Sequence, residues 1–145
     1  MGFLVIKSVR ISPSHTFWIK ITLHLAALSL LFVTYYQAFT DQLGADPVKA
    51  ILHFTGIGAF NLLLLSLLIS PLAKYLRQGQ LVTLRRPIGL YAFTYALSHF
   101  SSYLLFELQL EWSLLLSELL KRPYISVGFI ALLILSILTA TSTKS

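Results

Sequence analysis

The 145-residue chain is 57% apolar and only 11% charged, with a mean hydropathy of +0.80, which excludes an ordinary soluble domain. It has no cysteine, which excludes disulfides and thiolate metal ligands, so any metal would be held by histidine or carboxylate. The net charge of +6 fits the cation bias of membrane proteins, and no nucleic-acid partner is needed to explain it. We therefore expect an integral membrane protein in contact with a lipid bilayer.

Four apolar blocks are long enough to cross a bilayer, since about 20 residues of helix span its hydrocarbon core. The blocks are continuous and lack the short alternating segments of a membrane barrel, which favours helices. Pro47, Pro87 and Pro123 stand in the first turns of three blocks, Asp46 is a natural N-cap, and Pro71 can close or kink the second block. The sequence predicts an all-α membrane protein with one transmembrane domain over 1–145 and four helices, at 17–39, 48–72, 87–106 and 124–141.

The segment 107–122 differs from these blocks. Glu107, Glu111 and Glu118 interrupt leucines at helical spacing, and Trp112 offers an interfacial ring. We expect this segment to lie along the outer membrane surface. A plain connecting helix and a docking surface for an external partner both remain open.

The distribution of cations predicts the orientation, because lysine and arginine beside membrane helices stay cytoplasmic. One group of cations precedes or opens the first block: Lys7, Arg10 and Lys20. A second group fills the connection between the second and third blocks: Lys74, Arg77, Arg85 and Arg86. The acidic residues lie on the other side of the membrane. We expect a multi-pass protein of the cytoplasmic (inner) membrane with a cytoplasmic N-terminus.

His99 lies in the middle of the third block, where an imidazole has no water to satisfy it. Ionisable residues inside membrane segments are costly, and neutral imidazole is a common axial ligand of haem iron. A rise of about 1.5 Å per residue places His99 about 10 Å, and His53 about 8 Å, below the outer ends of their helices. His24 lies near the inner end of the first block, so it is a poor co-ligand for His99.

The neighbours of His99 on one helical face are small or aromatic: Ala92, Tyr95, Ala96, Ser102 and Tyr103. Small residues leave room for a porphyrin, and Gly56 lies one turn beyond His53. Small residues also mediate ordinary packing of membrane helices, and a histidine can hydrogen-bond across two helices. From the pattern alone, ligation and packing both stay open for His99, and packing is favoured for His53 and His24.

Three segments carry a resemblance to a known family: LGADPVKAILHFTG (43–56), RRPIGLYAFTYALSHFSSYLLFE (85–107) and KRPYISVGF (121–129). Read together, they resemble the MsrQ (YedZ) family, the haem-binding membrane subunit of the bacterial protein-methionine-sulfoxide reductase system. This family is part of the ferric-reductase-like transmembrane group. The resemblance spans the chain from about Trp18 onward.

The resemblance implies electron transfer across the cytoplasmic membrane, from the quinone pool or a flavin reductase, to a periplasmic molybdopterin-containing catalytic subunit. That subunit reduces oxidised methionines in periplasmic proteins. The implied cofactors are haem b and, as a second candidate, FMN. In the family, the histidine at the position of His99 is an axial ligand of the haem iron. The histidine at the position of His53 is a possible haem-binding residue. No flavin site and no catalytic set are assigned, so any enzyme activity of the chain itself stays open.

The family has a six-helix bundle, whereas this sequence ends after its fourth predicted helix. In the family the fifth helix carries histidines that complete haem ligation, so we expect a C-terminally truncated member in which His53 is the histidine at a suitable depth to substitute. Two alternatives remain: a non-redox structural or assembly protein without haem, and a transporter or proton channel, for which the sequence shows no second buried charge or broken-helix repeat.

Overall fold

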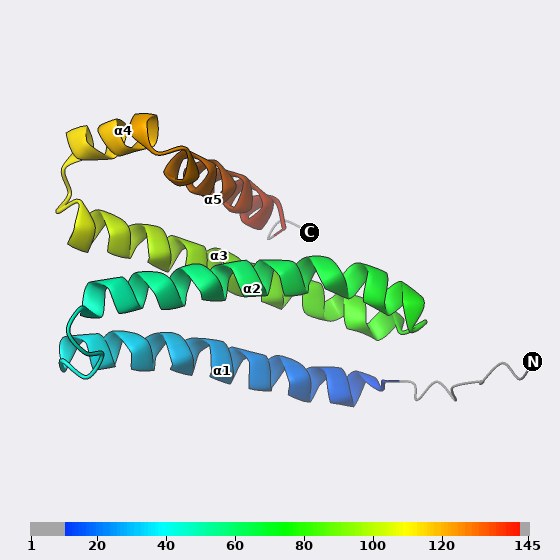
Figure 1. Ribbon diagram of the computed structural model, residues 1–145. Coiled ribbons are helices and arrows are strands. Elements are labelled where there is room, and N and C mark those ends of the chain that lie inside the picture. Colours follow the sequence, from blue (N-terminus) through cyan, green and yellow to red (C-terminus); the bar gives the residue numbers. More distant parts are fainter. Residues whose placement is uncertain (1–10, 143–145) are drawn as a thin grey trace, which may run out of the picture.

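The computed structural model describes residues 11–142, so Lys7, Arg10 and Lys144 lie outside the described residues. All regular structure within 11–142 is helical, which confirms the predicted all-α class. The elements in chain order (Figure 1) are α1 (Pro13–Phe39), α2 (Pro47–Tyr75), the 3-10 helix η1 (Gly79–Leu84), α3 (Arg85–Ser102), the π-helix η2 (Tyr103–Glu107), α4 (Trp112–Lys121) and α5 (Pro123–Ser142).

Side-chain caps and prolines start the long helices. The Asp46 carboxylate accepts a hydrogen bond from the Lys49 backbone N–H at 3.0 Å, which confirms the predicted N-cap of α2. Ser12 caps α1 in the same way, followed by Pro13 in the first turn. Because this cap precedes the apolar block, α1 begins before the predicted start at residue 17.

α2 runs through Pro71 to Tyr75, beyond the predicted end at residue 72. Arg77 then adopts a left-handed conformation (φ 54°), and the Gln78 N–H donates to the Ala73 carbonyl at 2.9 Å. This hydrogen bond closes the helix as in a Schellman motif. Pro71 therefore does not end the helix, because a proline inside a helix removes one backbone donor and the following turn is still bonded.

α2 and α3 form the central pair of the fold, with α1 packed along both (Figure 1). Buried Ala27, Tyr91 and Tyr95 join the three helices, with Phe54 and Ala59 of α2 packed against them. A second apolar cluster of Ile69, Leu84 and Ile88 lies where η1 leads into α3. α3 is thus enclosed by its neighbours, whereas α5 contacts mainly α3 and α4.

Hydrogen bonds tie α1 to α3 along their shared length. The Tyr95 hydroxyl donates to the Ala27 carbonyl at 2.7 Å, and the Tyr91 hydroxyl lies 2.6 Å from His24 Nδ1. Nearer the α4 end, the Tyr35 hydroxyl is 2.5 Å from Ser102 Oγ. No buried side-chain nitrogen or oxygen among the described residues lacks a partner. These bonds replace the water that a polar side chain would lose on entering an apolar environment.

Three of the four predicted spans are long and apolar enough to cross a membrane: α1, α2 and α5. Their outward side chains are apolar and exposed, as for Phe32 of α1 (72%) and Ile137 of α5 (65%), which suits lipid contact. α3 is not among these spans, because its 18 residues include Arg85, Arg86 and several polar side chains, which lower its mean hydropathy. The count of four spanning helices remains a prediction.

The end of α3 forms a sharp corner. α3 passes into the π-helix η2, where the Leu108 N–H donates to the Tyr103 carbonyl at 3.1 Å. Gln109 and Leu110 then have φ of 50° and 63°, which turns the chain toward α4. Buried Leu104, Leu108 and Leu115 hold α4 against this corner. α4 occupies residues 112–121 of the segment that we predicted to be interfacial.

Gly58 tests the close packing of α2 on α3. A Cβ at Gly58 would lie 2.6 Å from Tyr95 Cδ1, whereas a Cβ at Gly128 in α5 would meet nothing within 4 Å. We expect Gly58→Ala to lower the free energy of unfolding in detergent by about 1–3 kcal/mol, as overpacking does. Gly128→Ala is the matched control and should leave stability unchanged or raise it by up to about 1 kcal/mol. Equal stability of the two variants in thermal unfolding would contradict this packing.

Candidate functional site

His99 lies on α3 and is held against α2. Its Nδ1 is 2.9 Å from the Leu52 carbonyl oxygen and 3.3 Å from Thr55 Oγ1. The Thr55 hydroxyl hydrogen is already used, since it donates to the Ile51 carbonyl at 2.7 Å. A carbonyl can only accept, so Nδ1 of His99 carries the proton. In the neutral ring, Nε2 then has a bare lone pair.

Gly56 allows the His99 ring to lie this close to α2. A Cβ at position 56 would be 3.0 Å from Cε1 and 3.1 Å from Nδ1 of His99. Even alanine would therefore press on the imidazole ring and on the atom that bonds Leu52. Gly56, one turn beyond His53 on α2, thus makes room for His99 of α3.

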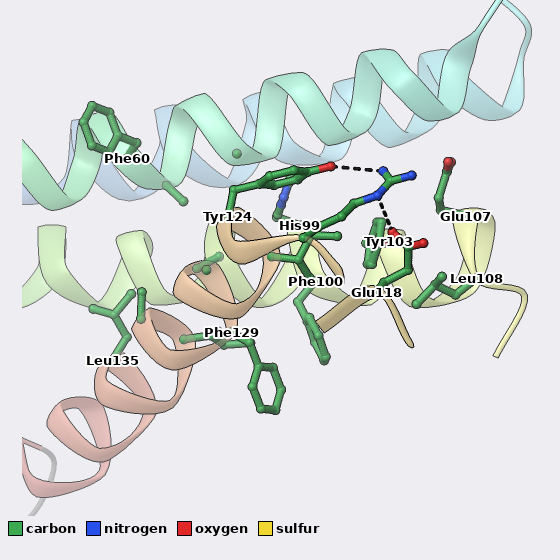
Figure 2. Close-up of a pocket in the computed structure, with 18 of the residues that line it drawn as sticks. Phe60, His99, Phe100, Tyr103, Glu107, Leu108, Glu118, Tyr124, Phe129 and Leu135 are labelled. Carbon is green, nitrogen blue, oxygen red and sulfur yellow. Dashed lines mark hydrogen bonds and ion pairs between the residues drawn. The ribbon is translucent and has the colours of Figure 1, made fainter. Parts of the chain in front are cut away.

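A cavity of about 600 Å³ opens between α2, α3 and α5, with His99 in its wall (Figure 2). This volume is within the usual range for cofactor and small-molecule sites, about 300–1,000 Å³. Small residues of α2, α3 and α5 leave the space open, namely Gly56, Ala59, Ala96, Gly128 and Ala131. Three phenylalanine rings also line it, those of Phe60, Phe100 and Phe129. Among the described hydrogen bonds, His99 uses Nδ1 only, so Nε2 stays available for a ligand.

One end of the cavity is polar, where α4 meets α5. Arg122 Nε lies 2.8 Å from Glu118 Oε2, and Arg122 Nη1 donates to the Tyr124 hydroxyl at 3.0 Å; both contacts are dashed in Figure 2. The hydrogen bond to Tyr124, and then the charge of Glu118, hold the pKa of Arg122 above its ordinary value. Tyr103 and Glu107 complete this end. The cavity is therefore apolar along most of its length and charged at one end.

His53 and His24 lie in different surroundings. His53 is exposed on α2 and lines a shallow depression of about 400 Å³ together with Lys49 and His99. His24 is bonded to Tyr91 on the α1 side of α3 and lines neither hollow. The structure thus brings His53 and His99 to one depression and keeps His24 apart from both. Groups of three or more histidine, cysteine or acidic side chains suited to a metal ion are absent from residues 11–142.

The small and aromatic neighbours of His99 divide between two roles. Ala92, Tyr95 and Ser102 are buried, with Tyr95 packed against α1 and α2 and Ser102 bonded to Tyr35 of α1, whereas Ala96 and Tyr103 line the cavity. The prediction that this face leaves room for a cofactor is therefore correct for only part of it. One face of a helix can meet a neighbouring helix along part of its length and a cavity along another part. The sequence does not tell which residues of the face meet which.

Three cavity residues were missed as site residues by the sequence argument: Glu118, Arg122 and Tyr124. Their signal was the Lys-Arg-Pro-Tyr stretch at 121–124, in which a proline starts α5 directly after a cation. The place of Arg122 at the cavity depends on the corner between α4 and α5, which is a tertiary feature.

Comparison with known proteins gives a consistent result. Residues 55–145 match the family model "Ferric reductase like transmembrane component". The chain is 44% identical over 137 residues to "Protein-methionine-sulfoxide reductase heme-binding subunit MsrQ" of Enterobacter sp. (strain 638), covering 94% of this chain and 69% of the relative. This chain belongs to the MsrQ family. Proteins of the same name from Salmonella paratyphi B and Salmonella heidelberg match the MsrQ-family chain equally well.

The family assignment confirms the resemblance found in the sequence and makes this MsrQ-family chain a multi-pass membrane protein of a redox-related transmembrane group. The family model begins at Thr55, beside Gly56, and includes all of α3, α4 and α5. It therefore contains His99 and the polar end of the cavity. No solved structure matches the chain.

The protonation of His99 can be measured directly. We expect nitrogen-15 NMR of the histidine-labelled chain, without added cofactor and at a pH where imidazole is neutral, to show His99 protonated on Nδ1 and bare on Nε2. The Leu52 carbonyl selects this tautomer. Loss of the signals in His99→Gln assigns them.

His53 serves as the internal control, because none of the described hydrogen bonds reaches its ring, and it should show a mixture of tautomers. A His99 ring protonated on Nε2 would contradict the arrangement described for α2 and α3.

Proposed function

We propose that this chain is a haem-binding membrane subunit that passes electrons across the cytoplasmic membrane to a methionine-sulfoxide reductase partner, with His99 as an axial iron ligand. One observation carries the proposal: the Leu52 carbonyl holds Nδ1 of His99, while Nε2 remains available beside a cavity of about 600 Å³. Metal-bound histidine usually donates its other ring N–H to a carbonyl or carboxylate. The curated relatives are named as heme-binding subunits, which supports the same cofactor here.

The residues present fit a haem. The ring would meet aromatic and small side chains, such as Phe60, Phe100 and Ala96, which suit a flat apolar group. Gly56 sets the depth of the His99 ring, and the Leu52 carbonyl fixes its rotation and tautomer. Haem b supplies one-electron transfer when bound, and the chain's residues hold, orient and shield it.

His53 is the residue of this chain that we propose for the second axial position. It does not line the larger cavity, but it shares a shallow depression with His99 and lies on the helix that carries Gly56. His24 is unsuited, since its ring is bonded to Tyr91. The chain spans 69% of the length of the relatives that it matches, so the activity of those whole proteins is a proposal for this one.

The proposed path starts at the quinone pool or a flavin reductase and ends at a periplasmic molybdopterin-containing subunit that repairs oxidised methionines. The orientation of the chain supports this path. Lys74, Arg77, Arg85 and Arg86 gather where α2 leads through η1 into α3, which we place at the cytoplasmic side. The cavity lies toward the α4 end and would then be near the periplasmic acceptor. FMN is a second cofactor of the proposal, without assigned residues.

A non-redox structural or assembly role is the second candidate. Its support is that His99 already has hydrogen-bond partners on α2, as an interhelical packing residue would. In this case Nε2 would serve no ligand, and the cavity would be filled by lipid or by other helices. Haem absorbance separates the two candidates.

Histidine variants test the ligand assignment. We expect the purified chain in detergent to show a b-type haem spectrum, and His99→Ala to abolish it, because the iron loses its protein ligand. His24→Ala should retain the spectrum, since its partner is Tyr91. His53→Ala should keep haem but convert a low-spin to a high-spin spectrum. Pyridine haemochrome measures haem per protein.

Retention of haem in His99→Ala would exclude His99 as the ligand. A wild-type chain without haem, but with normal helical circular dichroism, would favour the structural or assembly role.

Electron transfer needs a separate assay. We expect membranes that contain this chain and a molybdopterin-containing reductase to oxidise a quinol and reduce protein methionine sulfoxide, because the haem would connect donor and acceptor. Membranes with His99→Ala are the matched control and should lose the reaction. Reduction at the same rate without this chain would contradict the proposed role.

A further inference from the structure

The cavity of His99 has a charged end whose purpose the haem ligand alone does not explain. Of the residues that line the cavity, Arg122 is the only one with a positive charge. Its side chain is 54% exposed, so an incoming group can reach it. A cation that serves only to orient the protein in the membrane has no reason to face a cofactor-sized cavity. Arg122 is paired with Glu118 there, and its exposed guanidinium can also meet a ligand with a negative edge.

Arg122 is held at two points and still has hydrogen-bond capacity. Its Nε contacts Glu118 and its Nη1 donates to Tyr124, whereas a guanidinium carries five N–H donors. The Tyr124 hydroxyl accepts from Arg122, so its own hydrogen remains free to be donated to a ligand oxygen. In Figure 2, a dashed line joins Tyr124 and another joins Glu118 to the same guanidinium, and both residues line the cavity.

Hydrogen bonds within and between α4 and α5 hold the backbone around Arg122. The Arg122 N–H donates to the Glu118 carbonyl at 2.9 Å and ends α4, and Pro123 begins α5 at the next residue. The Ser126 hydroxyl of α5 donates to the Leu119 carbonyl of α4, which fixes the two helices to each other. A binding group on such a corner loses little freedom when its ligand arrives.

We propose that Arg122 and Tyr124 bind the propionate carboxylates of the haem whose iron is held by His99, with Glu118 as the internal carboxylate that competes for the same guanidinium. The inference rests on the proposed haem binding. Arginine matches a carboxylate with two parallel hydrogen bonds, which lysine cannot do. Haem b has an apolar ring and carboxylates along one edge, and the cavity has apolar walls and one polar end, where Arg122 is the cation beside Glu107 and Glu118. A phosphate group of a lipid is the other anion that an arginine fork accepts.

The test compares haem b with its dimethyl ester, in which both carboxylates are neutral. The full 145-residue chain is purified in a maltoside detergent, which contains no phosphate, and titrated with each ligand while the Soret absorbance is followed. Wild type should bind haem b more tightly than the ester. Arg122→Gln should weaken haem b binding roughly three- to tenfold, a modest effect because the guanidinium is half exposed, and should leave ester binding unchanged.

Lys121 provides the matched control, because it is the neighbouring cation and does not line the cavity. Lys121→Gln should leave both affinities unchanged. Arg122→Lys should fall between wild type and Arg122→Gln, since it keeps the charge and loses the fork. Glu118→Gln should tighten haem b binding and not ester binding, because it removes the competing carboxylate.

Four outcomes would overturn the inference. Equal affinity of wild type for haem b and the ester would show that the carboxylates are not bound, while haem binding itself would stand. An equal loss of both ligands in Arg122→Gln would show a structural effect, and an Arg122 dependence seen only after phospholipid is added would assign the arginine to lipid phosphate. No Soret band with either ligand would refute the proposed haem binding together with this inference.

Discussion

The structure depends on one constraint: polar side chains of α3 lie among apolar helices and must find their hydrogen-bond partners there. Tyr91 and Tyr95 are bonded to α1, and His99 is bonded to the Leu52 carbonyl of α2. These bonds fix the rotation of α3 about its own axis relative to both neighbours. The packing of Gly58 on the Tyr95 ring and of Gly56 on the His99 ring follows from that rotation. By composition, α3 is too polar to be counted among the helices that could cross a membrane, yet it packs at the centre of the fold.

The same constraint explains how His99 can be both a packing residue and a candidate ligand. Its two ring nitrogens have different environments: Nδ1 satisfies the α2 backbone, and Nε2 remains available beside the cavity. The two interpretations left open by the sequence are therefore compatible at the level of atoms. Helix packing supplies the orientation that a metal ligand needs, at no further cost in side-chain freedom.

The corner formed by η2, α4 and α5 decides the shape and charge of the cavity. α3 ends in a π-helix, and two residues with positive φ send the chain into α4. Pro123 then starts α5, which returns along α3 and closes the third wall of the cavity. Arg122 lies at the junction of α4 and α5, so the only cation of the cavity is placed by the meeting of two helices. The apolar walls and the charged end thus come from different parts of the chain.

The sequence by itself determined the all-α membrane class, the Asp46 cap and the family, because hydropathy, capping residues and motifs are local properties. It also separated His24 from His99 by counting helical rise. Only the tertiary structure decided that Ala92 and Ser102 fill packing contacts while Ala96 lines a cavity, that Gly56 serves His99, and that Arg122 faces the same cavity. These facts depend on how helices rotate and cross. A helical pattern names the residues that share a face, and the neighbouring helices determine what that face meets.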